Sequence, residues 1–150
     1  MKTNRLLLPL IFLAAVCGLV PAARAADRAD IQGILLTASN EKGPTDGRLA
    51  AYEPTLRRIL RFESYHYVGD DSTALAVPSD GSLSLGDGHQ LELTTERAEG
   101  KAVHVKVRWL ANGRSLMSTG LVLRPGVPAV LGGPSTGHKG EVYAVIVIGR

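Results

Sequence analysis

The sequence predicts an α+β fold, a mainly antiparallel β-sandwich or strongly curled sheet with one amphipathic helix near the start of the mature chain. Three observations predict it. Short apolar or alternating segments fill most of the chain, turn-forming dipeptides separate them, and only one stretch has helical periodicity. The chain has 150 residues. Because residues 1–25 have the features of an export signal, we expect a single β-rich domain over 26–150.

The first 25 residues follow the pattern of a secretory signal peptide. A short basic head precedes an apolar run over 6–20, and Ala23-Arg24-Ala25 supplies the small residues that a signal peptidase recognises. The run is shorter than the roughly 20 residues that a membrane-spanning helix needs. We therefore expect cleavage after Ala25, a periplasmic or secreted product and no transmembrane span in the mature chain. Cys17 is not expected to carry a lipid anchor, because Ala14-Ala15-Val16 is a poor lipidation sequence.

The charge of the mature chain differs from that of the precursor. Lys2, Arg5 and Arg24 are three of the 17 basic residues, whereas none of the 14 acidic residues lies in the signal. The remaining 14 basic residues balance the acidic ones, so the isoelectric point of about 9.2 largely reflects the segment that is removed. No nucleic-acid partner is therefore expected. Without Cys17 the mature domain has no cysteine, and its stability must come from packing.

The chain begins with a strand and the predicted helix. Ile31–Ser39 is a short apolar segment that predicts a strand, and 40–47 is a polar loop rich in turn formers. Apolar residues then recur at spacings of three and four on one helical face: Leu49, Tyr52, Leu56, Ile59 and Leu60. Pro54 implies either that the regular helix begins near it or that the helix bends there.

Strands and turns fill the rest of the chain. The predicted strands are Phe62–Val68, Thr73–Val77, Ser82–Leu85, Gln90–Thr95, Ala102–Leu110, Ser115–Leu123, Pro128–Leu131 and Glu141–Ile148. Asp80-Gly81, Asp87-Gly88 and Asn112-Gly113 each favour a tight turn with positive φ. The Asn112-Gly113 turn is expected to join two paired strands into a hairpin.

The last predicted strand differs from the others. Val142–Ile148 is apolar at every position, so both of its faces need cover. We expect a central strand with the helix on one side and a second sheet or a neighbouring molecule on the other.

No coherent catalytic, metal or cofactor site is predicted. Gly133–Gly137 matches G-x-S-x-G, but a strand follows it instead of a helix, and the order of acid and histidine is wrong for a hydrolase. His66 with Asp70 and Asp71 could bind a cation, although solvated turn carboxylates are the favoured interpretation.

Two tyrosines are candidate binding residues. Tyr65 and Tyr67 alternate along one strand and share a face, so they could stack on a sugar, although core packing explains alternating aromatic residues equally well.

Two resemblances rest on particular residues. Pro125–Arg150, with Val130-Leu131-Gly132-Gly133 and the apolar last strand, resembles the strand, Gly-Gly turn and strand of secretins. Secretins are long ring subunits with repeated amino-terminal modules that this chain lacks, so no secretin function is carried over. The whole layout is also similar to small exported bacterial proteins, with one helix running into a strand that holds Phe62 and Tyr65. That resemblance implies no activity.

These features favour a non-enzymatic exported envelope module. We expect it to join another envelope protein, or itself, by strand addition at a sheet edge or along the last strand, with Val145 and Val147 as contact residues. The alternative is a small glycan-binding or glycan-hydrolysing domain. A cleft that gathers two acids such as Glu92 and Glu96 with aromatic side chains would favour that alternative.

Overall fold

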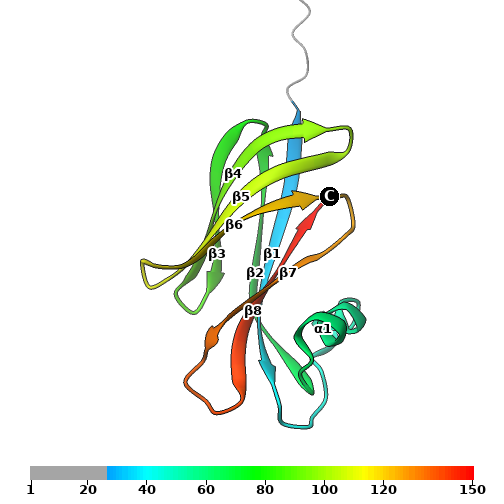
Figure 1. Cartoon of the computed structure of the whole chain (residues 1–150), viewed down its shortest axis with the longest axis vertical. Coiled ribbons are helices and arrows are strands. Elements are labelled where there is room, and N and C mark those ends of the chain that lie inside the picture. The colour runs from blue at the N-terminus through cyan, green and yellow to red at the C-terminus, as the bar shows by residue number, and fades with distance from the viewer. Residues whose placement is uncertain (1–26) are drawn as a thin grey trace, which may run out of the picture.

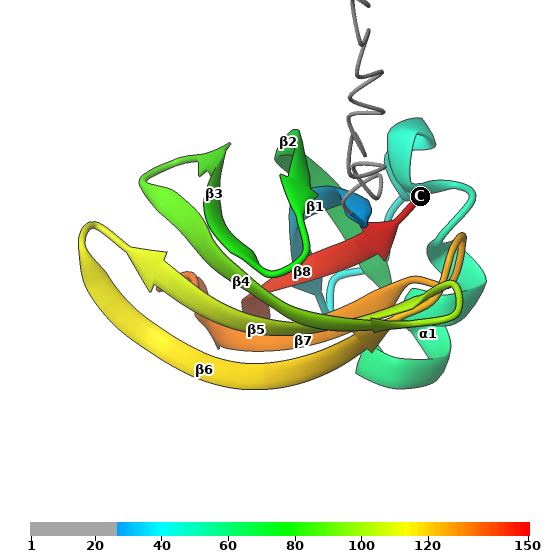
Figure 2. The same ribbon diagram turned by 90° about the horizontal axis from the view of Figure 1, so that it is seen from above.

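Two four-stranded antiparallel sheets, packed face to face, form the fold in the computed structural model, which describes residues 27–150 (Figures 1 and 2). In spatial order the first sheet holds β2 (Ser64–Ala76), β1 (Arg28–Ser39), β8 (Glu141–Gly149) and β7 (Ala129–Ser135). The second holds β3 (Ser79–Gly86), β4 (His89–Glu99), β5 (Ala102–Ala111) and β6 (Arg114–Leu123). The α+β sandwich prediction is confirmed. The predicted signal, with Cys17 and the cleavage site after Ala25, lies outside the described residues.

The first pair of strands in the first sheet is longer than the sequence predicts. β1 begins at Arg28 instead of Ile31, and β2 runs continuously through Gly69-Asp70-Asp71, where a turn between two strands was predicted. β2 pairs with β1 along its whole length, with one register shift between Leu35 and Leu36. The prediction of two short strands is therefore wrong: the Gly-Asp-Asp segment lies within a strand, and its carboxylates accept hydrogen bonds from neighbouring strands.

The helical region is divided into two short helices. A 3-10 helix, η1 (Gly47–Leu49), precedes α1 (Glu53–Leu60), whose first turn contains Pro54, so the first of the two predicted alternatives is confirmed. Arg61 ends α1 in a left-handed conformation with φ of 55°. Leu56 is fully buried, but Ile59 is 48% exposed and does not belong to the buried face to which it was assigned. No helix of residues 27–150 has the length and apolar character to cross a membrane.

Two of the three predicted turns are confirmed. Asp87-Gly88 and Asn112-Gly113 have positive φ values at both residues and join β3 to β4 and β5 to β6. The Asp80-Gly81 prediction is wrong, because this dipeptide lies inside β3. A Cβ atom on Gly81 would come within 2.4 Å of the Leu75 side chain, so glycine leaves room here for close packing between β2 and β3.

The two faces of β8 belong to different cores. Val145 and Val147 lie between the two sheets, where they contribute to a cluster with residues such as Leu91 and Trp109. Ala144, Ile146 and Ile148 point to the other face, where η1 and α1 cover the first sheet. The predicted central strand with cover on both faces is thus confirmed, and Figure 1 shows α1 beside this sheet.

Candidate functional site

The four outer strands of the sandwich differ in how well their edges are protected. On one side, β2 and β3 cover each other: the backbone N–H of Ser84 donates to Asp71 Oδ2 at 3.0 Å. A Cβ atom on Gly69 would lie only 2.1 Å from the carbonyl oxygen of Leu85. The backbones of β2 and β3 are therefore in contact, and this side of the sandwich is closed.

The opposite side is open. Among residues 27–150, β6 and β7 each have a hydrogen-bonded strand on one side only. β7 is a poor acceptor for a further strand, because its pairing register is interrupted between Gly132 and Ser135, and Pro134 has no N–H to donate. β6 is the better acceptor.

The β6 edge, defined as Arg114–Leu123, lacks most of the features that normally prevent edge-to-edge pairing. Natural edge strands are protected by charged side chains, prolines, bulges or covering segments. β6 is ten residues long, contains no proline, and has Arg114 as its one charged residue. Its register with β5 shifts once, close to its start, opposite Trp109 and Leu110. The remainder is a regular, neutral edge.

An apolar groove lies beside the first half of this edge. The groove, which we call the Trp109 groove, has a volume of about 320 Å³ and lies between the start of β6 and the end of β7. Its lining residues are Trp109, Leu116, Met117, Gly132, Gly133 and Pro134. Farther along β6, Thr119 and Leu121 face the space between the sheets but are only half-buried. The β6 side of the sandwich therefore exposes part of its inner face.

Trp109 forms the floor of the groove and is fixed on two sides. Its indole Nε1–H donates to His89 Nδ1 at 2.9 Å, and its side chain is fully buried. A Cβ atom on Gly133 would lie 2.2 Å from the edge of the indole ring, so only glycine fits there. The His89 ring packs 4.4 Å from the ring of Tyr143, whose hydroxyl donates to Asp87 Oδ2 at 3.0 Å. The groove floor is therefore rigidly supported.

His89 gives the stability of the domain a specific pH dependence. Burial lowers the pKa of His89 below its ordinary value of 6.5, although the nearby Asp87 carboxylate opposes the shift. As the pH falls below 6.5, the unfolded chain takes up a proton that the folded chain resists, so stability is lost until the pH reaches the lower folded pKa. We expect the unfolding midpoint of the wild type to fall more between pH 7.5 and 5 than that of His89→Gln, measured by urea titration. Equal pH dependence in both proteins would contradict this assignment.

The charges around β6 are also distinctive. On β5, Lys106 and Arg108 form ion pairs with Glu96 and Glu92 of β4, at 3.2 and 2.7 Å. Arg114 at the start of β6 and Arg124 just after its end are exposed and form no ion pair within residues 27–150. The neutral edge is therefore flanked by two cations that are free to attract acidic groups.

The predicted tyrosines lie on the far side of the molecule from this edge. Tyr65 is fully buried under the helical segment, and its hydroxyl donates to the carbonyl of Phe62 at 3.2 Å. Tyr67 is half-buried: Arg48 stacks 4.0 Å over its ring, and its hydroxyl bonds Asp70. The two do share a face, as predicted, but one ring is enclosed and the other is covered by a guanidinium. A sugar-binding role for them stays a prediction.

The placement of β8 changes how strand addition could occur. Val145 and Val147 are fully buried between the sheets, and β8 is paired with β1 on one side and β7 on the other. The last strand therefore has no free edge, which corrects the expectation that it could accept a partner strand. A binding role for these two side chains stays a prediction and would require the sheets to separate.

The residues of the glycan alternative do not gather in one cleft. Glu92 and Glu96 are paired with basic residues on the second sheet, whereas Tyr65 and Tyr67 lie on the first. Trp109 lies in the core between the sheets. Within residues 27–150, no group of three or more His, Cys, Asp or Glu side chains is arranged to hold a metal ion. Ser135 of the G-x-S-x-G match ends β7, and the turn after it leads into β8.

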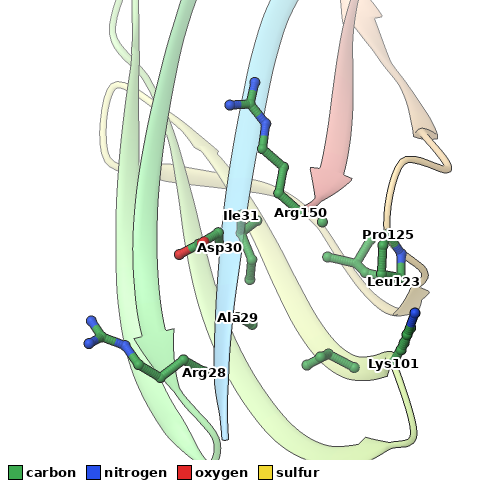
Figure 3. A pocket seen from close by; sticks show the side chains of 10 residues that line it. Arg28, Ala29, Asp30, Ile31, Lys101, Leu123, Pro125 and Arg150 are labelled. Atoms are coloured by element: carbon green, nitrogen blue, oxygen red, sulfur yellow. The ribbon is translucent and has the colours of Figure 1, made fainter.

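A second hollow lies where β1 begins and β8 ends (Figure 3). Its apolar wall includes Ile31 and Leu123, and Arg28, Lys101 and Arg150 surround it. Figure 3 shows that the three cationic side chains point in different directions. They do not form a cradle for a single anion, so the β6 edge with its groove is the stronger candidate site.

Comparison with known proteins gives a weak likeness. No protein-family model matches the sequence, and no curated protein matches it. Among solved structures, the cryo-EM structure of the T2SS secretin XcpQ from Pseudomonas aeruginosa is similar at 11% identity and a TM-score of 0.36. The match covers 82% of this chain and 55% of that chain, so the chain spans about half the length of the secretin. This likeness establishes neither a shared fold nor a function.

The β6 edge was not among the residues selected from the sequence. Its strand was predicted, but whether a strand lies at an edge depends on the order of strands in the sheet. The sequence signal that could have indicated an edge is the absence of charged side chains in Ser115–Leu123. The other long strands of the second sheet, β4 and β5, both contain charged residues.

Proposed function

We propose that the domain is a non-enzymatic module of the bacterial envelope that binds an extended segment of another envelope protein along the β6 edge. The observation that carries the proposal is the contrast between the two sides of the sandwich. The β2–β3 side is closed by backbone contact, whereas the β6 edge is neutral, regular and next to an apolar groove. An added strand would satisfy free backbone groups and cover the half-buried inner face. The envelope location rests on the predicted export signal.

A second copy of this chain is a poorer occupant than a different protein. Antiparallel alignment of two β6 edges would place Arg114 of each copy beside Leu123 and Arg124 of the other, at both ends of the pair. Like charges across a strand pair are destabilising. The flanking arginines therefore oppose self-pairing and favour a partner strand with neutral or acidic ends.

The test compares two lysine substitutions on adjacent residues. Thr119 faces the inner side of β6, opposite Val107, whereas Ser118 faces solvent, opposite Arg108. An inward charge on an edge strand blocks strand pairing. We expect Thr119→Lys to weaken binding at least tenfold and Ser118→Lys to change it less than threefold, although both add the same charge. Binding of a synthetic 12-residue peptide of alternating Val and Thr with terminal Asp residues is measured by fluorescence anisotropy on the purified exported protein.

Hydrogen exchange then locates the contact. Peptide binding should slow amide exchange in 114–123 and leave 79–86 unchanged. Protection of β3, or of β7 without protection of 114–123, would overturn the proposal, as would equal loss of binding in the two variants. Dimerisation through β6 without peptide would also overturn it, in favour of self-association. Circular dichroism confirms that both variants remain folded.

A further inference from the structure

This inference rests on the proposed function and concerns the chemistry of the partner. We infer that the segment bound along β6 runs antiparallel to it, places a large apolar side chain in the Trp109 groove, and carries acidic residues opposite Arg114 and Arg124. The three parts of the inference depend on separate observations.

Antiparallel pairing is expected because every strand pair of the second sheet is antiparallel, and antiparallel pairs are slightly more stable per residue than parallel ones. The position of the groove then fixes which part of the partner enters it. Leu116 and Met117, which line the groove, lie near the Arg114 end of β6. At the other end, the chain crosses to the first sheet, where Pro125 bridges Gly149 and Gly126 N–H donates to the Gly149 carbonyl at 3.0 Å. The two ends of the edge are therefore different: the groove lies beside one end, and the chain leaves for the first sheet at the other. In an antiparallel partner, the groove receives a residue from the carboxyl-terminal part.

The lining of the groove determines the kind of side chain. Directly opposed residues in an antiparallel pair point to the same face of the sheet. Met117 pairs with Trp109 and faces inward, so the partner residue opposite Met117 points into the groove. Gly132 and Gly133 contribute no side chains there, and the groove volume of about 320 Å³ leaves room for a large side chain. A large apolar side chain such as Leu or Phe would fill this space and cover the exposed parts of Leu116 and Met117.

The two arginines define the ends of the bound segment. Arg114 and Arg124 are ten positions apart in the chain, which corresponds to about 33 Å along an extended strand. Neither has an ion-pair partner within residues 27–150. An acidic residue about three positions after the apolar anchor would lie near Arg114, and a second acid near the start of the segment would lie near Arg124. From its amino-terminal end, the recognised segment thus has an acidic residue, a neutral stretch of alternating residues, the apolar anchor and a second acidic residue.

The test uses a set of 12-residue peptides with the purified exported protein. The reference peptide has Asp at both ends, alternating Val and Thr, and Leu at the anchor position. Replacing that Leu by Ala should weaken binding about 10-fold or more, because the alanine side chain would leave most of the apolar surface of the groove uncovered. The reversed sequence, which has the same composition but places Leu at the other end, should bind at least fivefold more weakly than the reference.

Double-mutant cycles test the charges. Arg114→Gln and replacement of the carboxyl-terminal Asp by Asn should show coupling of twofold or more, and Arg114→Gln should show none with the amino-terminal Asp. Arg124→Gln should show coupling with the amino-terminal Asp and none with the carboxyl-terminal Asp. If the reference peptide protects the amides of 114–123 but the Leu-to-Ala and reversed peptides bind as well as the reference, the anchor and direction are wrong while the proposed function stands. If no peptide protects β6, the proposed function itself fails.

Discussion

Val147→Lys should leave most of the protein unfolded in isolation. Val147 is fully buried on the central strand β8, in the core between the two sheets. A lysine there must either bury an unpaired charge or separate the sheets, and an uncompensated buried charge costs about 3–5 kcal/mol. Since small domains have about 5–15 kcal/mol of stability in total, we expect loss of the cooperative unfolding transition or a very low urea midpoint.

Val122→Lys is the matched control for this substitution. Val122 has the same side chain and also lies in a strand, but it is 44% exposed on the outer face of β6. Its replacement should change the free energy of unfolding by less than about 0.5 kcal/mol. If Val147→Lys instead unfolds at the wild-type urea concentration, the two-core arrangement of β8 is wrong.

This contrast shows which parts of the fold the sequence could predict. The two-sided cover of β8 followed from an uninterrupted apolar run, because such a strand can be stable only with packing on both faces. Hairpins at Asp87-Gly88 and Asn112-Gly113 also followed from local chemistry. Asp80-Gly81 has similar local chemistry but lies within β3, because Gly81 provides space for Leu75 of a neighbouring strand. Local patterns cannot distinguish a glycine needed for a turn from one needed for a close approach.

The candidate site was less accessible to prediction because it depends on strand order. The hydrophobic pattern of 115–123 predicts a strand, and the Asn112-Gly113 turn predicts its partner, β5. Nothing local shows that its other side is unpaired or that Gly133 of β7 approaches Trp109 from the opposite sheet. Val145 and Val147 were selected for binding because the same apolar run suits either a core or an interface. Burial and pairing place them in the core, so the open edge lies elsewhere.

Trp109→Ala should be the most damaging truncation among the aromatic residues of the core between the sheets. Trp109 is fully buried, and truncation of such a side chain costs about 3–5 kcal/mol. The variant would also leave His89 Nδ1 without the donor that it now has at 2.9 Å. We expect a urea midpoint far below that of the wild type, with a smaller loss for Trp109→Phe, which keeps an aromatic ring. A cost below about 1 kcal/mol for Trp109→Ala would mean that the indole is not a central packing element.

Trp109→Phe also separates the two roles of this side chain. A protonated His89 would direct an Nδ1–H at the indole Nε1–H, so the wild-type contact opposes protonation; a phenyl ring has no such donor. The loss of stability on acidification should therefore be smaller in Trp109→Phe than in the wild type, even though its stability at pH 7.5 is lower. The phenyl ring in Trp109→Phe still provides an apolar floor between Met117 and Gly133. A leucine-anchored peptide should therefore bind to the variant within about fivefold of its affinity for the wild type. The hydrogen bond to His89 would then add to the effect of burial on how the domain responds to pH, whereas the apolar surface of residue 109 would affect what the groove accepts.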